Sequence, residues 1–199
     1  MALSRIDGSV QISGNLQVDG NILPLRPRSE IAQTDFAAYG IPVAQLRIHD
    51  AFATPISAAA SDDLGISTGG TFGTDAPYIT AGDLKAAGAT TRRARFLFTL
   101  PAEYVSAESV RISAFAGMVT TAADTSCTLD FEAYKLDLDA TVGGSDLVST
   151  AAISINSTTI AERAFDLTAS GLVAGDVLDI RVSIACNDAA TATAVIPAT

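Results

Sequence analysis

The sequence contains no tryptophan and a single histidine, and these absences narrow the kinds of site that it can hold. Aromatic residues make up 6% of its 199 residues, although hydrophobic residues make up 48%. Small residues supply much of the remainder, which suits thin sheets packed through small side chains better than a helical bundle. A carbohydrate-binding platform usually exposes Trp or Tyr. Four tyrosines and no tryptophan therefore favour such a platform only weakly.

The sequence also has few basic residues. Twelve Lys and Arg against 22 Asp and Glu give a net charge of −10. A surface of this sign repels phosphate backbones, so we expect no nucleic acid as a partner. The charge is uneven, because residues 1–29 carry Arg5, Arg26 and Arg28 against two aspartates, for +1, which leaves −11 for the rest. We therefore expect a solvated acidic domain and a near-neutral N-terminal segment that is attached to something.

Long hydrophobic runs and closely spaced cysteines are missing too. The first ten residues lack the apolar core of a signal peptide, and no run is long enough to cross a membrane. Cys127 and Cys186 are too few and too far apart to indicate a metal site or a disulfide scaffold. We expect synthesis in a cytoplasm, which favours free thiols; a disulfide formed late, in an assembled particle, is the alternative.

No motif of a known catalytic site is present. His49 lies on the polar side of a predicted strand, so we expect a surface residue rather than a base or a ligand. There is no Gly-x-Ser-x-Gly motif, and one outward histidine cannot complete a triad. A carbohydrate-active enzyme would need a carboxylate pair facing a cleft, and no spacing singles one out. We predict no enzymatic activity, no catalytic residue and no cofactor.

Other charged groups receive structural interpretations. The pairs Asp62–Asp63 and Asp137 with Asp139 could offer oxygen ligands to calcium, but no calcium-loop spacing surrounds either pair, so we assign no metal site. Three arginines lie close together in an acidic chain. We expect them to pair with carboxylates within or between subunits; they are Arg92, Arg93 and Arg95.

Residues 1–24 contain a repeat with a period of six. Glycines recur at positions 8, 14 and 20, and each is followed by a short alternating apolar stretch. Stacked coils are the usual meaning of such a repeat, yet fewer than three units cannot bury their own apolar face. We therefore predict a β stem completed by other chains, three being the natural number; a tail or an added edge strand is the alternative. The predicted trimer core consists of Val10, Ile12, Leu16, Val18 and Ile22.

Residues 25–44 form a predicted connector. Three prolines lie within it or directly before it, the first being Pro24, and we consider a short helix within 30–38. Residues 45–199 form the predicted main domain. It begins with a strand at 45–52 and continues in a long irregular loop at 54–91, for which we consider one short strand near 78–80.

Strict alternation of apolar and polar residues then predicts strands at regular intervals. The organising stretch is 91–118, where two alternating runs are separated by Pro101; further strands are predicted at 127–133, 147–155, 165–167, 176–186 and 192–196. Eight main strands and almost no helix indicate an antiparallel β-sandwich, and we favour a jelly roll. Cys127 and Cys186 share the inward parity of their strands. We predict that both face the core, close together on adjacent antiparallel strands.

Three runs carry a resemblance to the jelly-roll domains of tailed-bacteriophage structural proteins: RFLFTLPAEYVSAESVRISAFAGM, YKLDLDATVGGSDL and FDLTASGLVAGDVLDIRVSIACND. Such domains occur in head fibres, capsid decoration proteins and tail-fibre tips, and the glycine-hexad segment resembles their trimeric stems. The resemblance is one of pattern, so no functional residue is carried over. It implies a homotrimeric, non-enzymatic protein on the virion surface that binds the major capsid protein or another virion protein.

Within that resemblance we favour a capsid decoration protein or short head fibre, held to the shell by Arg5, Arg26 and Arg28. In the opposite polarity the sandwich docks and the stem points outward. The alternative function is a tail-fibre or tail-tip protein that binds a receptor or glycan. That reading predicts exposed aromatic side chains in the 54–91 loop, where Phe72 and Tyr78 are the candidates.

Overall fold

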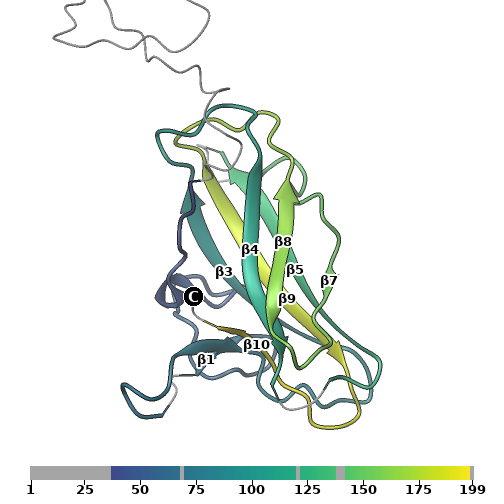
Figure 1. The fold of residues 1–199 in the computed structure, drawn as a ribbon. Coiled ribbons are helices and arrows are strands. Elements are labelled where there is room, and N and C mark those ends of the chain that lie inside the picture. Colours follow the sequence, from purple (N-terminus) through teal and green to yellow (C-terminus); the bar gives the residue numbers. More distant parts are fainter. Residues whose placement is uncertain (1–36, 68–69, 120–121, 138–141, 198–199) are drawn as a thin grey trace, which may run out of the picture. The chain divides into compact units, whose positions relative to one another are not determined.

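The computed structural model describes residues 37–67, 70–119, 122–137 and 142–197. The chain divides into a unit of residues 1–39 and a unit of residues 40–199. The second unit is an antiparallel β-sandwich of two sheets (Figure 1). The predicted all-β jelly-roll fold is confirmed. In the described part of the chain, no helix is long and apolar enough to span a membrane.

Each sheet combines strands that are distant in the sequence. The first sheet has the order β1 (Gly65–Ser67), β2 (Tyr78–Thr80), β10 (Ala194–Pro197), β4 (Val110–Met118) and β8 (Ala161–Leu167). The second has the order β3 (Thr90–Thr99), β9 (Val177–Asn187), β5 (Ser126–Leu136) and β6 (Val142–Gly143), and β7 (Ile153–Ser154) also pairs with β5. In Figure 1, β4 and β8 lie in front of β3, β9 and β5.

The core follows from alternation along the long strands. On β9, every second residue from Leu178 to Cys186 is buried, and β5 repeats this pattern from Cys127 to Ala133. Because successive side chains of a strand point to opposite faces, each strand supplies one apolar row to the space between the sheets. The rings of Phe131 on β5 and Phe165 on β8 meet edge to face, with centroids 5.0 Å apart, and join the two layers.

The two cysteines lie where the inward parity of their strands predicts. Cys127 and Cys186 are directly opposite in the antiparallel β5–β9 pair, and both are fully buried. The predicted strand neighbours are therefore confirmed. The expectation of free thiols is wrong, because the two sulfur atoms form a disulfide between positions 59 residues apart.

Two predicted strands are mostly irregular. Within 45–52, Arg47 makes only single bridges, to Pro55 and Arg95, after a 3-10 turn, η2 (Val43–Gln45). The chain reverses just beyond it, and Pro55 has no N–H with which to extend a ladder. Within 147–155 only β7 is a strand, because this segment bonds to β5 at Leu147, to β8 at Ser149 and to β5 again at β7.

Irregular segments cover several strand edges. Residues 147–149 bond along β8, and the carbonyl oxygen of residue 57 accepts a hydrogen bond from the Ile66 amide on β1. Along β3, Arg47 bonds to Arg95, and residues 62 and 64 bond to Arg93. An uncovered edge is a template for pairing with another chain, so these segments protect the sheets.

Candidate functional site

The residues predicted to build the stem and to hold the shell lie outside the described residues. These are Val10, Ile12, Leu16, Val18 and Ile22 for the stem and Arg5, Arg26 and Arg28 for attachment. The helix predicted within 30–38 also falls mostly outside them, and residues 37 and 38 are not helical. The stem and its arginines therefore stay predictions, and the sandwich supplies the surfaces considered next.

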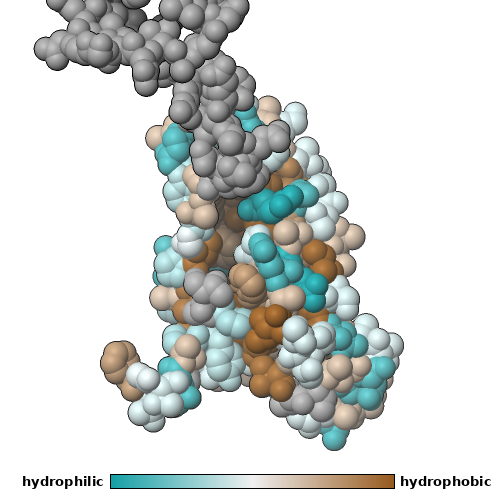
Figure 2. Space-filling model, viewed as in Figure 1, coloured by the Kyte–Doolittle hydropathy of each residue, from teal (hydrophilic) through white to brown (hydrophobic). Residues whose placement is uncertain are grey.

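The outer side of the first sheet carries an apolar surface. A groove of about 200 Å³ is lined there by residues of β2 and β10, by the residue that follows β4 and by the residue that precedes β8. We call this surface the apolar face and define it by Tyr78, Val119, Ile160, Val195 and Pro197. Figure 2 shows apolar side chains gathered over this end of the sheet.

Local sequence explains how the apolar face forms. Val119 and Ile160 are 54% and 40% exposed, and Phe115 on β4, which points to the same outer side, is 42% exposed. Between them on β4 is Gly117, where an added Cβ would lie 3.2 Å from Ile160 and 3.1 Å from the Ser157 carbonyl oxygen. The missing side chain lets Ile160 rest on bare backbone. Contiguous exposed apolar surface of this kind marks sites of protein interaction.

The outer side of the second sheet is charged instead. Arg95, Arg181 and Glu132 lie side by side in register on β3, β9 and β5. Arg95 donates to both oxygens of Asp179, and Arg181 donates to Glu132. The hydrogen bond and charge of Asp179 raise the pKa of Arg95 above its usual value, although burial opposes this.

The predicted pairing of the arginine cluster holds for two of its three members. Arg95 pairs with Asp179, and Arg93 lies 3.7 Å from Asp62. Arg92 binds backbone carbonyl oxygens, those of Ala81 and Asp83, in place of a carboxylate. All three arginine side chains therefore have partners within the sandwich, and together they form no open basic patch.

His49 does not lie on an open surface as expected. Its side chain is 14% exposed and lies between the carboxylates of Asp62 and Asp63. Sequence reasoning considered the histidine and the acidic pair separately, because 12 intervening residues of low complexity gave no sign that they meet. We call these three residues the His49 cluster. Among the described residues, it is the group of His, Cys, Asp and Glu side chains that could hold a metal ion.

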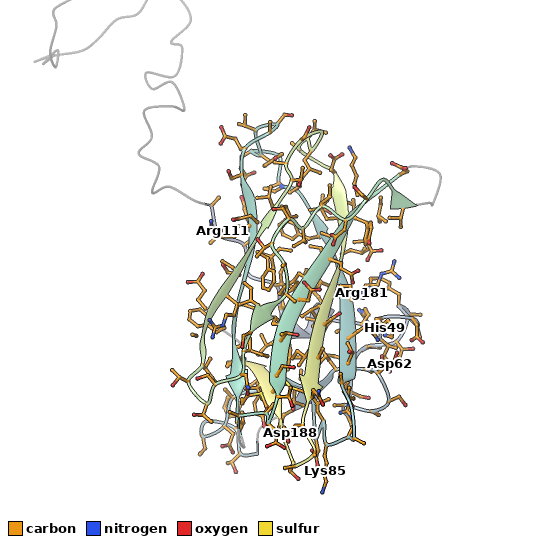
Figure 3. All side chains as sticks on the ribbon, turned by 90° about the vertical axis from the view of Figure 1, so that its right-hand side faces the viewer. His49, Asp62, Lys85, Arg111, Arg181 and Asp188 are labelled. Atoms are coloured by element: carbon orange, nitrogen blue, oxygen red, sulfur yellow. A yellow bond between two sulfur atoms is a disulfide. The ribbon has the colours of Figure 1, made fainter. Side chains whose placement is uncertain are left out.

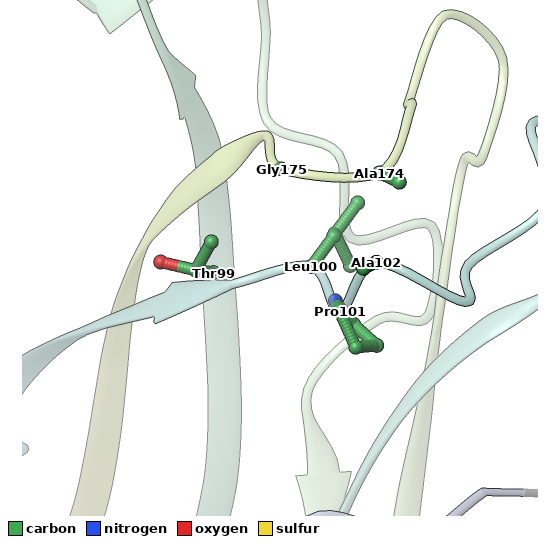
Figure 4. Close-up of a pocket in the computed structure, with 6 residues that line it drawn as sticks. All are labelled: Thr99, Leu100, Pro101, Ala102, Ala174 and Gly175. Atoms are coloured by element: carbon green, nitrogen blue, oxygen red, sulfur yellow. The ribbon is translucent and has the colours of Figure 1, made fainter.

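A hollow of about 570 Å³ lies at one end of the sandwich (Figure 4). Its lining contains one hydroxyl and otherwise apolar or backbone groups: Thr99, Leu100, Pro101, Ala102, Ala174 and Gly175. The Gly175 amide donates a backbone hydrogen bond of 2.9 Å to the Leu100 carbonyl oxygen, which joins the two segments that line the hollow. Acid–base or nucleophilic catalysis needs a positioned titratable group, which this lining does not supply.

The aromatic candidates of the 54–91 loop have different environments. Phe72 is fully exposed, and the Asp75 carboxylate accepts hydrogen bonds from the amides of Gly70 and Thr71 beside it. Tyr78 is half-buried on β2, within the apolar face. The predicted short strand near 78–80 is confirmed as β2.

The sequence matches no protein-family model and no curated protein. Among solved structures, the chain is similar to the CBM22-1 xylan-binding domain of Xyn10C from Paenibacillus barcinonensis, at 13% identity and a TM-score of 0.38, covering 68% of this chain and 77% of that one. It is also similar to a structure described as Family 16 Carbohydrate Binding Module-2, at 12% identity and a TM-score of 0.39, covering 67% and 81%. At these identities the likeness concerns the fold alone.

Proposed function

We propose that this chain is a non-enzymatic structural protein of a virion, a capsid decoration protein or short head fibre that assembles as a homotrimer and binds the assembled shell. The observation that carries the proposal is the apolar face. It combines exposed Val119 and Ile160 with a groove whose lining has no charged side chain. Apolar surface with few charges is typical of the centre of a protein–protein contact.

The proposed mode of action is adhesion. A protein that binds the assembled lattice, and not its dissociated subunits, shifts the balance towards the intact shell by mass action. Three linked contacts act together through their high effective concentration, which suits a trimer at a threefold position. The N-terminal arginines supply one attachment, and the apolar face supplies a second. The remaining acidic surface faces solvent, where like charge keeps particles apart.

The test is to place a charge on the apolar face. The double variant Val119→Asp/Ile160→Asp should lower occupancy on purified particles at least tenfold, because the contact would bury two carboxylates without partners. The matched control is Val142→Asp on β6, where the side chain is 47% exposed and lies away from the first sheet. Full occupancy of the double variant, with the control also bound, would exclude the apolar face as a shell contact.

One observation favours a second candidate, a tail-tip protein that binds a receptor or glycan. The ring of Phe72 is fully exposed in a loop whose backbone is fixed by Asp75. A solvent-exposed aromatic ring offers apolar surface that a ligand could cover. Phe72→Ala should then abolish binding to host cells or glycans, whereas Phe115→Ala, at a partly exposed ring on β4, should not. Unchanged binding in Phe72→Ala would remove this candidate.

A further inference from the structure

The only histidine of the sequence and two consecutive aspartates meet beside the outer edge of β3 (Figure 3). His49 Nε2 lies 3.4 Å from Asp62 Oδ2, and His49 Nδ1 lies 3.4 Å from Asp63 Oδ1. One nitrogen or oxygen atom from each residue lies within 4.8 Å of the others. The side chains of His49 and Asp63 are shielded, at 14% and 21% exposed, whereas Asp62 is 50% exposed and leaves a path to solvent.

The backbone brings these side chains together before any ligand arrives. Arg47 and Arg95 exchange two hydrogen bonds of 2.8 and 2.9 Å, which fix the segment that leads to the histidine. Arg93, two positions away on the same strand edge, donates to the Asp62 carbonyl oxygen at 2.7 Å and accepts from the Leu64 amide at 2.8 Å. Two loops are therefore anchored at neighbouring positions of one strand, so little ordering remains when a ligand binds.

The imidazole contacts within the cluster are long for hydrogen bonds. A good N–H···O hydrogen bond spans about 2.7–3.2 Å, and both imidazole contacts are longer, at 3.4 Å. The two contacts involve different ring nitrogens, so one of them joins two atoms that a single ion could bind, and an ion with bonds of about 2.0–2.1 Å holds such atoms about 3.4 Å apart. The mostly buried histidine and the two carboxylates each offer one ligand atom within 4.8 Å of the others, which is close enough to close around a small cation.

We propose that His49, Asp62 and Asp63 bind one divalent transition-metal ion of the Zn²⁺ class. One ring nitrogen and one oxygen from each carboxylate are the ligands, and water completes the coordination. The other ring nitrogen is not a ligand; it faces the second carboxylate, which can orient the ring. The nitrogen ligand sets this site apart from a calcium or magnesium site, since those ions take oxygen.

Binding also fits the charges around the cluster. Two carboxylates face the ion, and among the described residues the guanidinium in contact is that of Arg93, which lies 3.7 Å from Asp62 and is 30% exposed. That side chain can turn to solvent when an ion neutralises Asp62. The bound ion would then join the loop of residues 47–55 to the loop of residues 60–64 and fasten both to β3.

The test uses the full chain with any affinity tag removed. His49 is the only imidazole and both cysteines are in the disulfide, so few competing nitrogen or sulfur ligands exist. Calorimetric titration with ZnCl₂ should show one bound equivalent. Addition of Zn²⁺ should raise the unfolding temperature, and addition of Co²⁺ should give the visible absorption of a low-coordinate ion.

Two variants remove ligands while keeping side-chain shape. His49→Gln and Asp62→Asn should each weaken Zn²⁺ binding by more than about 100-fold, because losing a ligand should exceed the 10–100-fold typical of an outer partner. Asp166→Asn, which alters an exposed pair with Arg111 on the first sheet, should bind within twofold of the parent chain. Circular dichroism shows whether each variant is folded, and Asp62→Asn at the half-exposed position serves if His49→Gln unfolds.

Two results would overturn the site. One is a parent chain that binds Zn²⁺ no more tightly than the folded ligand variants. The other is an equal loss in Asp166→Asn, which would mean that binding follows overall negative charge.

Discussion

Cys127 on β5 and Cys186 on β9 lie directly opposite each other in register, and a disulfide joins them. Both residues are fully buried in the core between the sheets. The bond fastens two neighbouring central strands of the second sheet and closes a long loop that includes β6, β7 and β8.

Removing this disulfide should destabilise the sandwich without changing its fold. The double variant Cys127→Ala/Cys186→Ala should lose about 2–4 kcal/mol of unfolding free energy, because cross-linking positions 59 residues apart restricts the unfolded chain. Urea unfolding with and without a reductant measures the effect. The reductant should destabilise the parent chain and leave the variant unchanged; an equal response of both would contradict the assignment.

Breaking the pair between Arg95 and Asp179 should also be costly. Asp179 is 8% exposed at its side chain, so Arg95→Met leaves a buried carboxylate unpaired and should destabilise by about 2 kcal/mol, since the arginine itself is one-third exposed. The second variant Arg95→Met/Asp179→Leu should recover most of this loss. Chemical denaturation of the three chains tests both steps, and a double variant as weak as the single one would argue against the buried charge as the cause.

Gly65 on β1 should tolerate no side chain. An added Cβ would overlap the backbone of Ala58 and Ala59, which covers the edge of β1. We expect Gly65→Ala to destabilise by about 1–3 kcal/mol, because backbone must shift to make room. Gly88→Ala is the control, since a Cβ there meets open space. Thermal melting that ranks the two variants equally would show that the covering segment is not held as described.

Stability should fall in acid partly through Asp176. Burial alone would raise the pKa of this carboxyl, but hydrogen bonds from Lys135 and from the Val173 amide outweigh burial and lower its pKa below 3.8. A carboxyl whose pKa is lower in the folded state stabilises the fold at pH values above its pKa in the unfolded chain. This stabilisation is lost as the pH falls through its pKa in the folded state. Asp176→Asn should therefore flatten the loss of stability below about pH 4, by less than about 1 kcal/mol.

Urea unfolding at several pH values between 2.5 and 7 gives this profile. Lys135→Met, which removes the partner at 2.8 Å, should move the acid transition to higher pH. Superimposable profiles for the parent chain and Asp176→Asn would exclude this contribution.

The N-terminal segment should govern assembly. Deleting residues 1–24 should leave a folded sandwich that light scattering finds smaller than the trimer, because the predicted core of Val, Leu and Ile contributes about 1.5–3 kcal/mol for each buried side chain. Charge reversal at Arg26 and Arg28 should separately lower occupancy on particles. An unchanged mass after the deletion would refute the stem, and full occupancy after charge reversal would refute the arginine attachment.

Long strands were predictable because both of their faces are regular. In β3, β4, β5 and β9, alternation runs over at least nine residues, and the observed bounds agree closely with the predicted ones. One failure, at 147–155, occurs where one segment serves two sheets. Residues 147–155 also alternate, yet Leu147 bonds both to β5 and to the residue that follows β8. Alternation along the sequence does not indicate that a segment passes from one sheet to the other.

The surfaces were less predictable than the strands. The apolar face joins Tyr78, Val119 and Ile160 from three segments, each of which has an ordinary polar–apolar pattern by itself. The His49 cluster likewise depends on two loops anchored to one edge of β3. The order of strands in the sheets decides which distant segments become neighbours. The hydrophobic pattern of the sequence predicts the fold class but not this order.

The covered edges of β1, β3 and β8 have a consequence for crowding. A particle that carries many copies of one domain brings identical strands to a very high local concentration. Uncovered strand edges would then pair between neighbouring copies and join them irreversibly. With backbone groups on these edges already bonded to residues 57, 47 and 147–149, the edges of β1, β3 and β8 are closed to ladder pairing with neighbouring copies. A dense layer of such domains would therefore not join through these three edges.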